Sequence, residues 1–348
     1  MDDAKLKVFT QRMVGHVTGA SVMLMVEIGR QLGLFEAMAG LSTATSTAIA
    51  KRAGLVERYV REWLGAMVCG GIVEYDPAAG TYTLPAEHAA MLTGSSSRNL
   101  ASIAGFFPLL SRVMPAVAKA FRDGGGVPYS AYQPDFTDLM DRRSRPRYEE
   151  FLVERYLDLP GLGPRLTTGI RVADVGCGTG YCINLMAQHY PKSTFVGYDF
   201  SEAAIARARE EAQAIGLTNV TFIAQDVARL TTDVTFDLVT AFDAIHDQVD
   251  PAEVLRRIRA ALVPGGTFLM LDVCASSNLE DNVAAPMSAF IYTVSTMHCM
   301  TVSLAHNGAG LGTAWGTQVA TQMLKQAGFN EVQVFERVDP MNSLYVAR

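Results

Sequence analysis

The pattern of apolar and polar residues divides the chain into three parts. In residues 166–348, short apolar runs of strand length alternate with longer helical stretches, which predicts a mostly parallel sheet covered by helices. Residues 1–95 predict helices followed by two short strands, and residues 96–165 predict a helical connection. The expected fold class is therefore α/β, preceded by a mostly helical domain.

The run VADVGCGTG, residues 172–180, is the most specific local pattern. Apolar residues lead into Gly176, Gly178 and Gly180, and a helix-like segment follows. Strand, glycine-rich turn and helix predict the first unit of a nucleotide-binding domain, because glycine permits a tight turn and close approach of a ligand. Asp174 precedes the first glycine, where it disfavours a pyrophosphate and favours a cationic or amine-bearing tail. S-Adenosylmethionine carries both an ammonium and a sulfonium group.

Two more acids stand at the ends of predicted strands. Asp199 ends the apolar run of residues 194–199, and a carboxylate at the tip of the second strand accepts both hydroxyls of a ribose in such folds. Asp226 ends the run of residues 220–226, and its expected partner is the amino group of an adenine. Three strand ends with suitable residues in order make an ordinary strand–helix turn a weak alternative.

These motifs resemble those of class I S-adenosylmethionine-dependent methyltransferases over residues 166–348. The resemblance implies a Rossmann-like sheet of seven strands with the last strand antiparallel, and S-adenosylmethionine as cofactor. It implies the following contacts with the cofactor: the methionine end at Asp174, Gly176, Gly178 and Gly180, the ribose at Asp199, and the adenine at Phe200, Asp226 and Val227.

Residues 1–95 predict a long helix over residues 8–38, two shorter helices and two strands around the turn of residues 76–80. Helix, turn, helix and wing in this order indicate a winged helix, which is typical either of DNA binding or of a dimerisation module. Residues 1–92 contain eight basic and nine acidic side chains, whereas a DNA-binding face needs net positive charge. Dimerisation is therefore favoured, and a ligand-binding transcriptional regulator remains the rival interpretation.

A winged helix followed by such a domain resembles the small-molecule O-methyltransferases of plants and antibiotic-producing bacteria. The chain resembles more closely an actinobacterial-type winged-helix methyltransferase group, through residues 32–35, 75–85 and 243–248. The resemblance implies a homodimer that pairs through residues 1–95. Residues 96–165, with helices expected at 101–121 and 145–157, would then cap the substrate.

The expected chemistry lies after the strand of residues 236–242, in the segment DAIHDQ of residues 243–248. This segment and the glycine-rich turn face one crevice, because carboxyl ends of parallel strands line it. The segment lacks the Asn/Asp-Pro-Pro-aromatic pattern of methyltransferases that act on nucleobase amino groups. His246 instead offers a side chain whose ordinary pKa suits removal of a proton at neutral pH.

Plant-type O-methyltransferases have a His-Asp pair at this place as general base, and the resemblance gives that role to His246. The acid that orients the histidine in those enzymes corresponds to Asp272, but residues 312–316 lack their second flanking acid. Phe242 is expected on the cofactor side of the crevice, with Asp243 and Asp247 on the acceptor side. The alternative is a histidine that only lines the pocket.

Residues 275–311 are long for a connection between two strands. Their methionines and aromatic residues, followed by a glycine-rich stretch, indicate a lid over an apolar pocket for a small molecule, although each such residue alone is more typical of a core. Tyr292 and His298 are the polar members expected to contact the acceptor. Oxygen is the favoured acceptor atom. Sulfur or nitrogen without base catalysis is the alternative, and a protein acceptor would need an open groove.

Composition narrows the possible partners. Of 348 residues, 49% are hydrophobic and 18% charged, and the formal net charge of −6 gives no general attraction to nucleic acid or anionic lipid. Five cysteines without a C-x-x-C pair predict neither a metal site nor a disulfide framework, and favour a reducing cytoplasm. The start MDDAK has no basic region followed by an apolar core, so no signal peptide is expected. The apolar stretch of residues 14–35 is broken by Glu27 and Arg30, so no membrane span is expected there.

Overall fold

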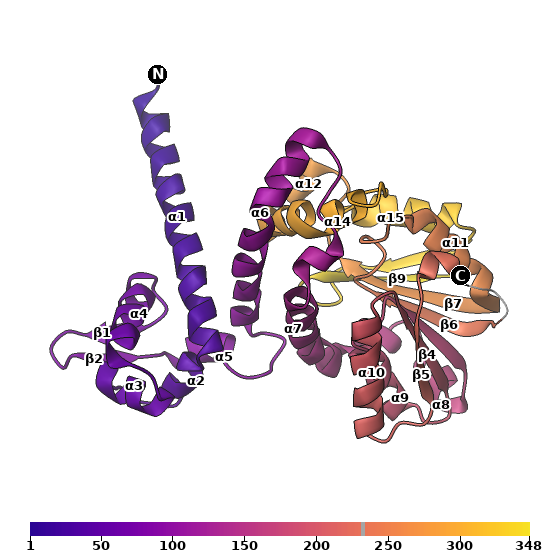
Figure 1. Cartoon of the computed structure of the whole chain (residues 1–348), viewed down its shortest axis with the longest axis horizontal. Helices are drawn as coiled ribbons and strands as arrows, with labels where there is room; N and C mark the ends of the chain where they lie inside the picture. Colours follow the sequence, from indigo (N-terminus) through magenta and orange to yellow (C-terminus); the bar gives the residue numbers. More distant parts are fainter. Residues whose placement is uncertain (231–233) are drawn as a thin grey trace. The chain divides into compact units, whose positions relative to one another are not determined.

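The computed structural model describes residues 1–230 and 234–348 (Figure 1). These residues pack as two compact units, residues 1–109 and residues 110–348. The first unit contains the expected winged helix, and the second contains the sheet.

The first unit is built from six helices and one hairpin within its described residues. Its elements are α1 (Asp3–Gln31), α2 (Leu34–Met38), α3 (Ser46–Ala53), α4 (Glu57–Cys69), β1 (Glu74–Asp76), β2 (Thr81–Thr83), α5 (Ala86–Leu92) and η1 (Leu100–Gly105). The rings of Phe35 and Trp63 meet edge to face at 5.3 Å, and the indole Nε1 of Trp63 donates to the carbonyl of Met25 at 2.8 Å. These contacts fasten α4 and α2 to the last third of α1, so the helices of the winged helix share one core.

Two expected helices differ from those in the structure. The helix expected over residues 8–38 is interrupted because Gly33 adopts the left-handed conformation, with φ of 65°, between α1 and α2. The helix expected over residues 101–121 begins as the 3-10 turn η1 and becomes α-helical only in α6 (Phe106–Asp123). Pro108 has no backbone N–H and lies in the first turn of α6, where a proline costs no helical hydrogen bond.

The second unit contains a seven-stranded sheet with the order β5-β4-β3-β6-β7-β9-β8. The strands are β3 (Arg171–Val175), β4 (Thr194–Asp199), β5 (Val220–Ala224), β6 (Phe236–Phe242), β7 (Leu262–Val273), β8 (Val332–Phe335) and β9 (Asn342–Ala347). Only β9 runs antiparallel to its neighbours, which confirms the expected Rossmann-like fold. The chain order reverses between β3 and β6, so the ligand crevice is expected above the carboxyl ends of these two strands.

Helices cover both faces of the sheet (Figure 1). Those that follow strands are α9 (Tyr181–His189), α10 (Glu202–Ala214), α11 (Pro251–Ala261) and α15 (Gly316–Gln326), with α8 (Gly163–Thr168) before β3 and the short η4 (Val227–Arg229) after β5. Residues of β3 alternate between two cores, with Val172 in one and Ala173 and Val175 in the other. The strand β3 is therefore buried on both faces of the sheet.

Two helical segments stand over the carboxyl ends of the strands. The first is η2 (Tyr129–Tyr132), α7 (Asp135–Phe151) and the π-helical η3 (Leu152–Leu157); the second is α12 (Leu279–Asn282), α13 (Ser288–Val294), the π-helical η5 (Ser295–Cys299) and α14 (Met300–Leu304). The second segment is the expected lid region. The stretch Leu100–Asp123 is long and apolar enough by composition to cross a bilayer, a test that core helices of soluble proteins also pass.

Candidate active site

The glycine-rich turn between β3 and α9 is shaped by three left-handed residues. Gly176, Gly178 and Gly180 have φ of 72°, 55° and 77°, a conformation that side chains disfavour. A Cβ at Gly180 would lie 2.7 Å from the Ala208 and Phe222 side chains, so this glycine permits close packing of the turn. A Cβ at Gly178 would meet nothing within 4 Å, so the protein leaves space beside its backbone.

Asp174 is buried at the end of β3, beneath this turn. Its carboxylate accepts a hydrogen bond of 2.7 Å from the Thr240 hydroxyl on the neighbouring strand β6. Burial raises the pKa of Asp174 to about 7, against the lowering effect of that hydrogen bond. A cationic ligand would favour its ionised form.

Asp199 connects the second strand to the turn. Its carboxylate accepts from the backbone N–H of Gly178 at 2.9 Å and of Ser201 at 2.8 Å. Burial raises the pKa of Asp199, and these two hydrogen bonds oppose that effect. The next residue, Phe200, is 61% exposed, with its ring 5.4 Å from that of Tyr129 in edge-to-face geometry. An exposed aromatic face beside a buried acid suits a nucleoside.

The other expected cofactor residues lie at the ends of β5 and β6. Asp226 is exposed and caps η4 by accepting from the N–H of Ala228, while Val227 is buried. Phe242 is buried at the end of β6, with its ring 5.5 Å from that of Tyr148 on α7.

His246 and Asp272 form a buried pair above β6 and β7. The imidazole Nδ1 lies 2.7 Å from the Asp272 carboxylate, and Asp272 is fully buried near the end of β7. Since a carboxylate accepts, Nδ1 carries the proton when the ring is neutral, and the lone pair of Nε2 is left free. The arrangement is that of an oriented general base.

Asp247 lies on the other side of the ring, with its carboxylate 3.3 Å from Nε2. Burial alone would lower the pKa of His246, but the charges of Asp272 and Asp247 raise it well above its ordinary value. His246 is therefore a stronger base than a free histidine, and it is neutral only at a correspondingly higher pH.

Asp243 occupies a separate network. It has φ of 51°, and its carboxylate accepts from Arg147 at 2.7 Å and from the Asn342 amide at 2.6 Å. Arg147 also donates to the side-chain Oδ1 of Asn342 at 2.7 Å. The network joins α7, the turn after β6 and the start of β9, and it uses both carboxylate oxygens of Asp243.

His298 lies fully buried in an aromatic cluster. Its ring stacks on Phe136 at 3.6 Å and meets the edges of Tyr132 at 4.6 Å and Tyr129 at 5.9 Å. Burial lowers the pKa of His298 to about 4, so the ring is neutral at neutral pH. Neither ring nitrogen has a hydrogen-bond partner within the described parts of the chain.

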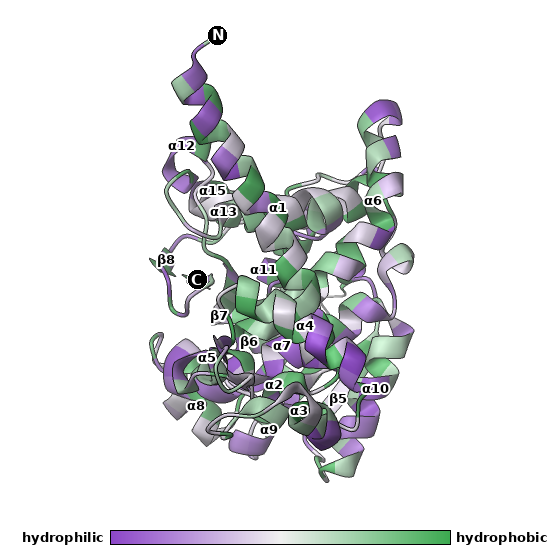
Figure 2. Cartoon of the chain, turned by 90° about the vertical axis from the view of Figure 1, so that its left-hand side faces the viewer, coloured by the Kyte–Doolittle hydropathy of each residue, from purple (hydrophilic) through white to green (hydrophobic). Residues whose placement is uncertain are grey.

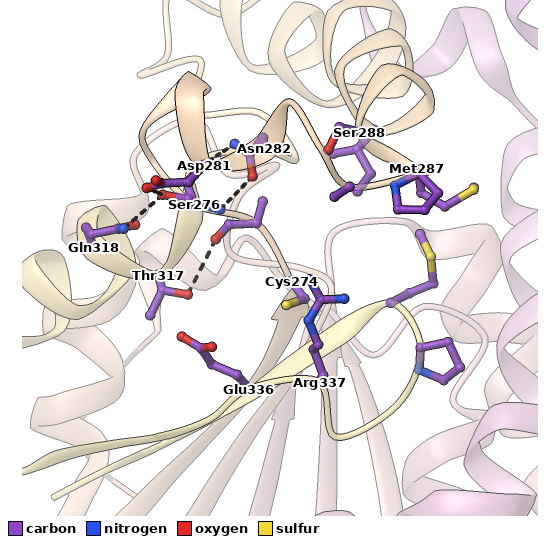
Figure 3. A pocket seen from close by; sticks show the side chains of 16 residues that line it. Cys274, Ser276, Asp281, Asn282, Met287, Ser288, Thr317, Gln318, Glu336 and Arg337 are labelled. Carbon is purple, nitrogen blue, oxygen red and sulfur yellow. Dashed lines mark hydrogen bonds between the residues drawn. The ribbon is translucent and has the colours of Figure 1, made fainter.

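Tyr292, on α13, is held at the start of the lid. Its hydroxyl accepts from the Asn282 amide at 3.1 Å, and the same amide donates to the carbonyl of Ser276 at 2.7 Å. Beside this contact is a cavity of about 370 Å³ (Figure 3), whose lining includes Cys274, Asn282, Met287, Thr317 and Arg337. The cavity shares no lining residue with the glycine-rich turn or with the His246 pair.

Several residues of the site were not expected from the sequence. Arg147 and Tyr129 belong to the segment before β3, where the helix expected over residues 145–157 instead begins at Asp135. Arg143 and Arg147 are four residues apart in α7 and therefore lie on one face of the helix. Had the helix been predicted to begin at Asp135, this pair of arginines would have been visible in the sequence. Cys299 and Asn342 reach the site from distant segments, and no local pattern marks them.

Each of the two units contains a segment that matches a known protein family. Residues 20–94 match an Rv2258c-like winged HTH domain, and residues 166–334 match a methyltransferase domain. The second unit therefore contains a methyltransferase domain. The trans-aconitate 2-methyltransferase of Acidovorax sp. is 27% identical over 135 residues, 39% of this chain and 48% of that protein. The ubiquinone biosynthesis O-methyltransferase of Coxiella burnetii is 30% identical over 127 residues, 36% of this chain and 49% of that protein.

The chain spans about half the length of these curated relatives. Solved structures resemble it over its full length. Mitomycin 7-O-methyltransferase MmcR has a TM-score of 0.70 at 16% identity, covering 100% of both chains. Human N-acetylserotonin methyltransferase, solved with S-adenosylmethionine, has a TM-score of 0.66 at 17% identity, covering 97% of both chains. At this identity the likeness shows the fold.

The residues of the methyltransferase domain fit S-adenosylmethionine. The space beside Gly178 admits a ligand against the backbone, and the buried carboxyl of Asp174 suits an amine-bearing tail. Asp199 has lone pairs left after its two backbone bonds, which suits ribose hydroxyls, and Phe200 offers an exposed ring.

We expect the substitution Asp272→Asn to lower the pKa of His246, because burial of the imidazolium then loses its strongest opposing charge. Titration of the ring signals by NMR, assigned with His246→Gln, measures this pKa. The matched variant Asp247→Asn should lower it less. An unchanged pKa in Asp272→Asn would contradict the assigned pair.

Proposed function

We propose that the chain transfers a methyl group from S-adenosylmethionine to an oxygen atom of a small molecule, with His246 as general base. The observation that carries the proposal is the pair of His246 and Asp272, which leaves Nε2 as the ring nitrogen that can accept a proton near the carboxyl end of β6. This strand borders β3, whose glycine-rich turn fits the cofactor. Base and cofactor site therefore share the crevice where the strand order reverses.

Bound S-adenosylmethionine supplies the activated methyl group. Asp174 and the three glycines hold its methionine end, Asp199 holds the ribose, and Phe200, Asp226 and Val227 border the adenine, with Phe242 on the same side. His246 takes the proton of the acceptor hydroxyl on Nε2, and Asp272 stabilises the imidazolium that forms. The remaining rate acceleration is expected from alignment of the acceptor oxygen with the methyl group of the cofactor.

The acceptor is proposed to lie between the His246 pair and the lid. Tyr292 and His298, both on the lid segment, are proposed to contact it, and Asp247 lies against Nε2. Asp243 is proposed as a residue that shapes the acceptor side, since its oxygens already bind Arg147 and Asn342. A thiol or amine acceptor, which needs little or no base, is the alternative.

We also propose that the chain forms a homodimer through its first unit. Eight large apolar side chains of α1 are exposed: Leu6, Val8, Phe9, Met13, Val14, Val17, Leu24 and Ile28. Figure 2 shows hydrophobic and hydrophilic positions alternating along α1. A second copy is the favoured occupant, because the near-equal charges of this unit disfavour DNA. The five free cysteines keep the cytoplasm as the expected location.

Asp199→Ala should weaken binding of S-adenosylmethionine about 10- to 100-fold, because hydrogen bonds to a charged acceptor each contribute about 1.5–3 kcal/mol. Isothermal titration calorimetry measures this affinity. Glu210→Ala, which removes an exposed carboxylate from α10, is the control and should bind like the wild type. If the wild-type chain does not bind S-adenosylmethionine, the proposed function is wrong.

His246→Gln should lower kcat about 10²–10⁴-fold for a hydroxyl acceptor and leave the affinity for S-adenosylmethionine unchanged. Release of S-adenosylhomocysteine with panels of phenols, carboxylic acids, thiols and amines provides the assay. The wild-type rate should rise with pH through a range above the ordinary histidine pKa, because only the neutral ring accepts a proton. Full activity of His246→Gln towards a hydroxyl acceptor would exclude the base.

Val14→Asp should convert the dimer to a monomer, because it places a charge in the exposed apolar surface of α1. Light scattering coupled to size-exclusion chromatography measures the mass. Gln11→Asp, at an exposed polar position of the same helix, is the matched control and should stay dimeric. A monomeric wild type at micromolar concentration would contradict the proposal.

A further inference from the structure

The Nε2 nitrogen of His246 has two neighbours that the proposed chemistry does not use. Asp247 follows it in the turn after β6, and Cys299 reaches it from the last residue of η5. The imidazole nitrogen, one carboxylate oxygen and the thiol sulfur all lie within 4.8 Å of one another. His246 and Cys299 are buried, while the Asp247 side chain is 27% exposed.

We propose that His246, Asp247 and Cys299 bind a zinc-class divalent cation, and that this cation inhibits methyl transfer by occupying Nε2 of His246. The binding site stands on these three residues alone, whereas the inhibition rests on the proposed function of His246 as base. The sequence did not predict the site, because its ligands come from two distant segments without a C-x-x-C pair.

The donor set selects the cation. Imidazole nitrogen, carboxylate oxygen and thiolate sulfur are the three ligand types that zinc combines in proteins, whereas magnesium and calcium take oxygen ligands. Nitrogen and oxygen ligands about 2.1 Å from a tetrahedral zinc lie about 3.4 Å apart. The Nε2 of His246 and the Oδ1 of Asp247 are 3.3 Å apart, so this pair already has the spacing of two zinc ligands.

The surroundings of the three ligands are those of a metal site. Asp272 holds Nδ1 of His246, which is the carboxylate–histidine arrangement that orients zinc-binding imidazoles. The Thr313 hydroxyl donates to the Cys299 sulfur at 2.9 Å, which fixes the third ligand. The Oδ1 of Asp247 is buried and has no hydrogen-bond partner within the described parts of the chain, since its contact with Nε2 lacks hydrogen-bond geometry.

Three protein ligands leave the fourth position of a tetrahedral zinc to water. The exposed part of Asp247 gives the cation a way in from the crevice. On binding, the Cys299 thiol gives its proton to solvent, a protonated His246 likewise loses the proton on Nε2 to solvent, and the Nε2 lone pair then forms the bond to the metal. The nitrogen then no longer accepts a proton from an acceptor hydroxyl.

The experiment uses the full chain after treatment with a chelator. Titration with Co²⁺ should give one bound ion per chain and a thiolate-to-cobalt absorption band, and Zn²⁺ should displace the cobalt. Cys299→Ser should lose the band, and Asp247→Asn should bind at least 10-fold more weakly. Cys274→Ser, which removes a thiol outside the cluster, should keep both the band and the affinity. Circular dichroism of each variant shows that it is folded.

Absence of stoichiometric binding by the wild type, or an unchanged band in Cys299→Ser, would overturn the metal site. Inhibition by Zn²⁺ is measured separately, with binding of S-adenosylmethionine followed by calorimetry in the same samples. Wild-type inhibition without loss of cofactor binding, relieved in Asp247→Asn relative to its own uninhibited rate, supports the proposal. Cobalt binding with full activity of His246→Gln would refute only the base and the inhibition, so the two proposals fail separately.

Discussion

The buried pair of Asp272 and His246 is the interaction on which the arrangement of the site depends. Asp272 stands near the end of β7, between β6 and β9, with no exposed surface. Burial of a carboxylate costs free energy unless hydrogen-bond donors compensate for the lost water. The imidazole of His246 and the backbone N–H of Val273 both donate to the Asp272 carboxylate. The sheet therefore sets the position of the turn after β6, and the carboxylate sets the tautomer of the ring.

A second charged network extends this constraint to the cover of the crevice. Arg147 joins α7 to Asp243 in the turn after β6 and to Asn342 at the start of β9. If Arg147 or Asp243 lost its partner, a buried charge would remain without compensation. The network therefore holds α7 against the sheet. The same helix contacts the glycine-rich turn, where Asp141 accepts from the Thr179 hydroxyl. Polar contacts of α7 thus reach both the glycine-rich turn and the turn after β6.

The sequence predicted what local patterns encode. The turn around Gly178 and the strand ends at Asp199 and Asp272 were placed correctly, because strand periodicity and glycine conformations act within a few residues. The contacts of Arg147 with Asn342 and of His246 with Cys299 join distant segments, and nothing local specifies them. The break at Gly33 was missed because the apolar pattern continues across it, although glycine in a left-handed conformation ends helices. The roles of the site residues stay predictions.

The features that would make His246 a base also make it a metal ligand. A carboxylate on Nδ1 increases the basicity of Nε2, and it does so for a proton and for a cation alike. The residues around Nε2 distinguish a base from a metal ligand. Here they are the carboxylate of Asp247 and the thiol of Cys299, and not apolar side chains. Asp247 raises the pKa of the ring, which slows proton removal at neutral pH, so a role in catalysis alone does not explain its position. A site that also binds a cation accounts for the carboxylate and the thiol together.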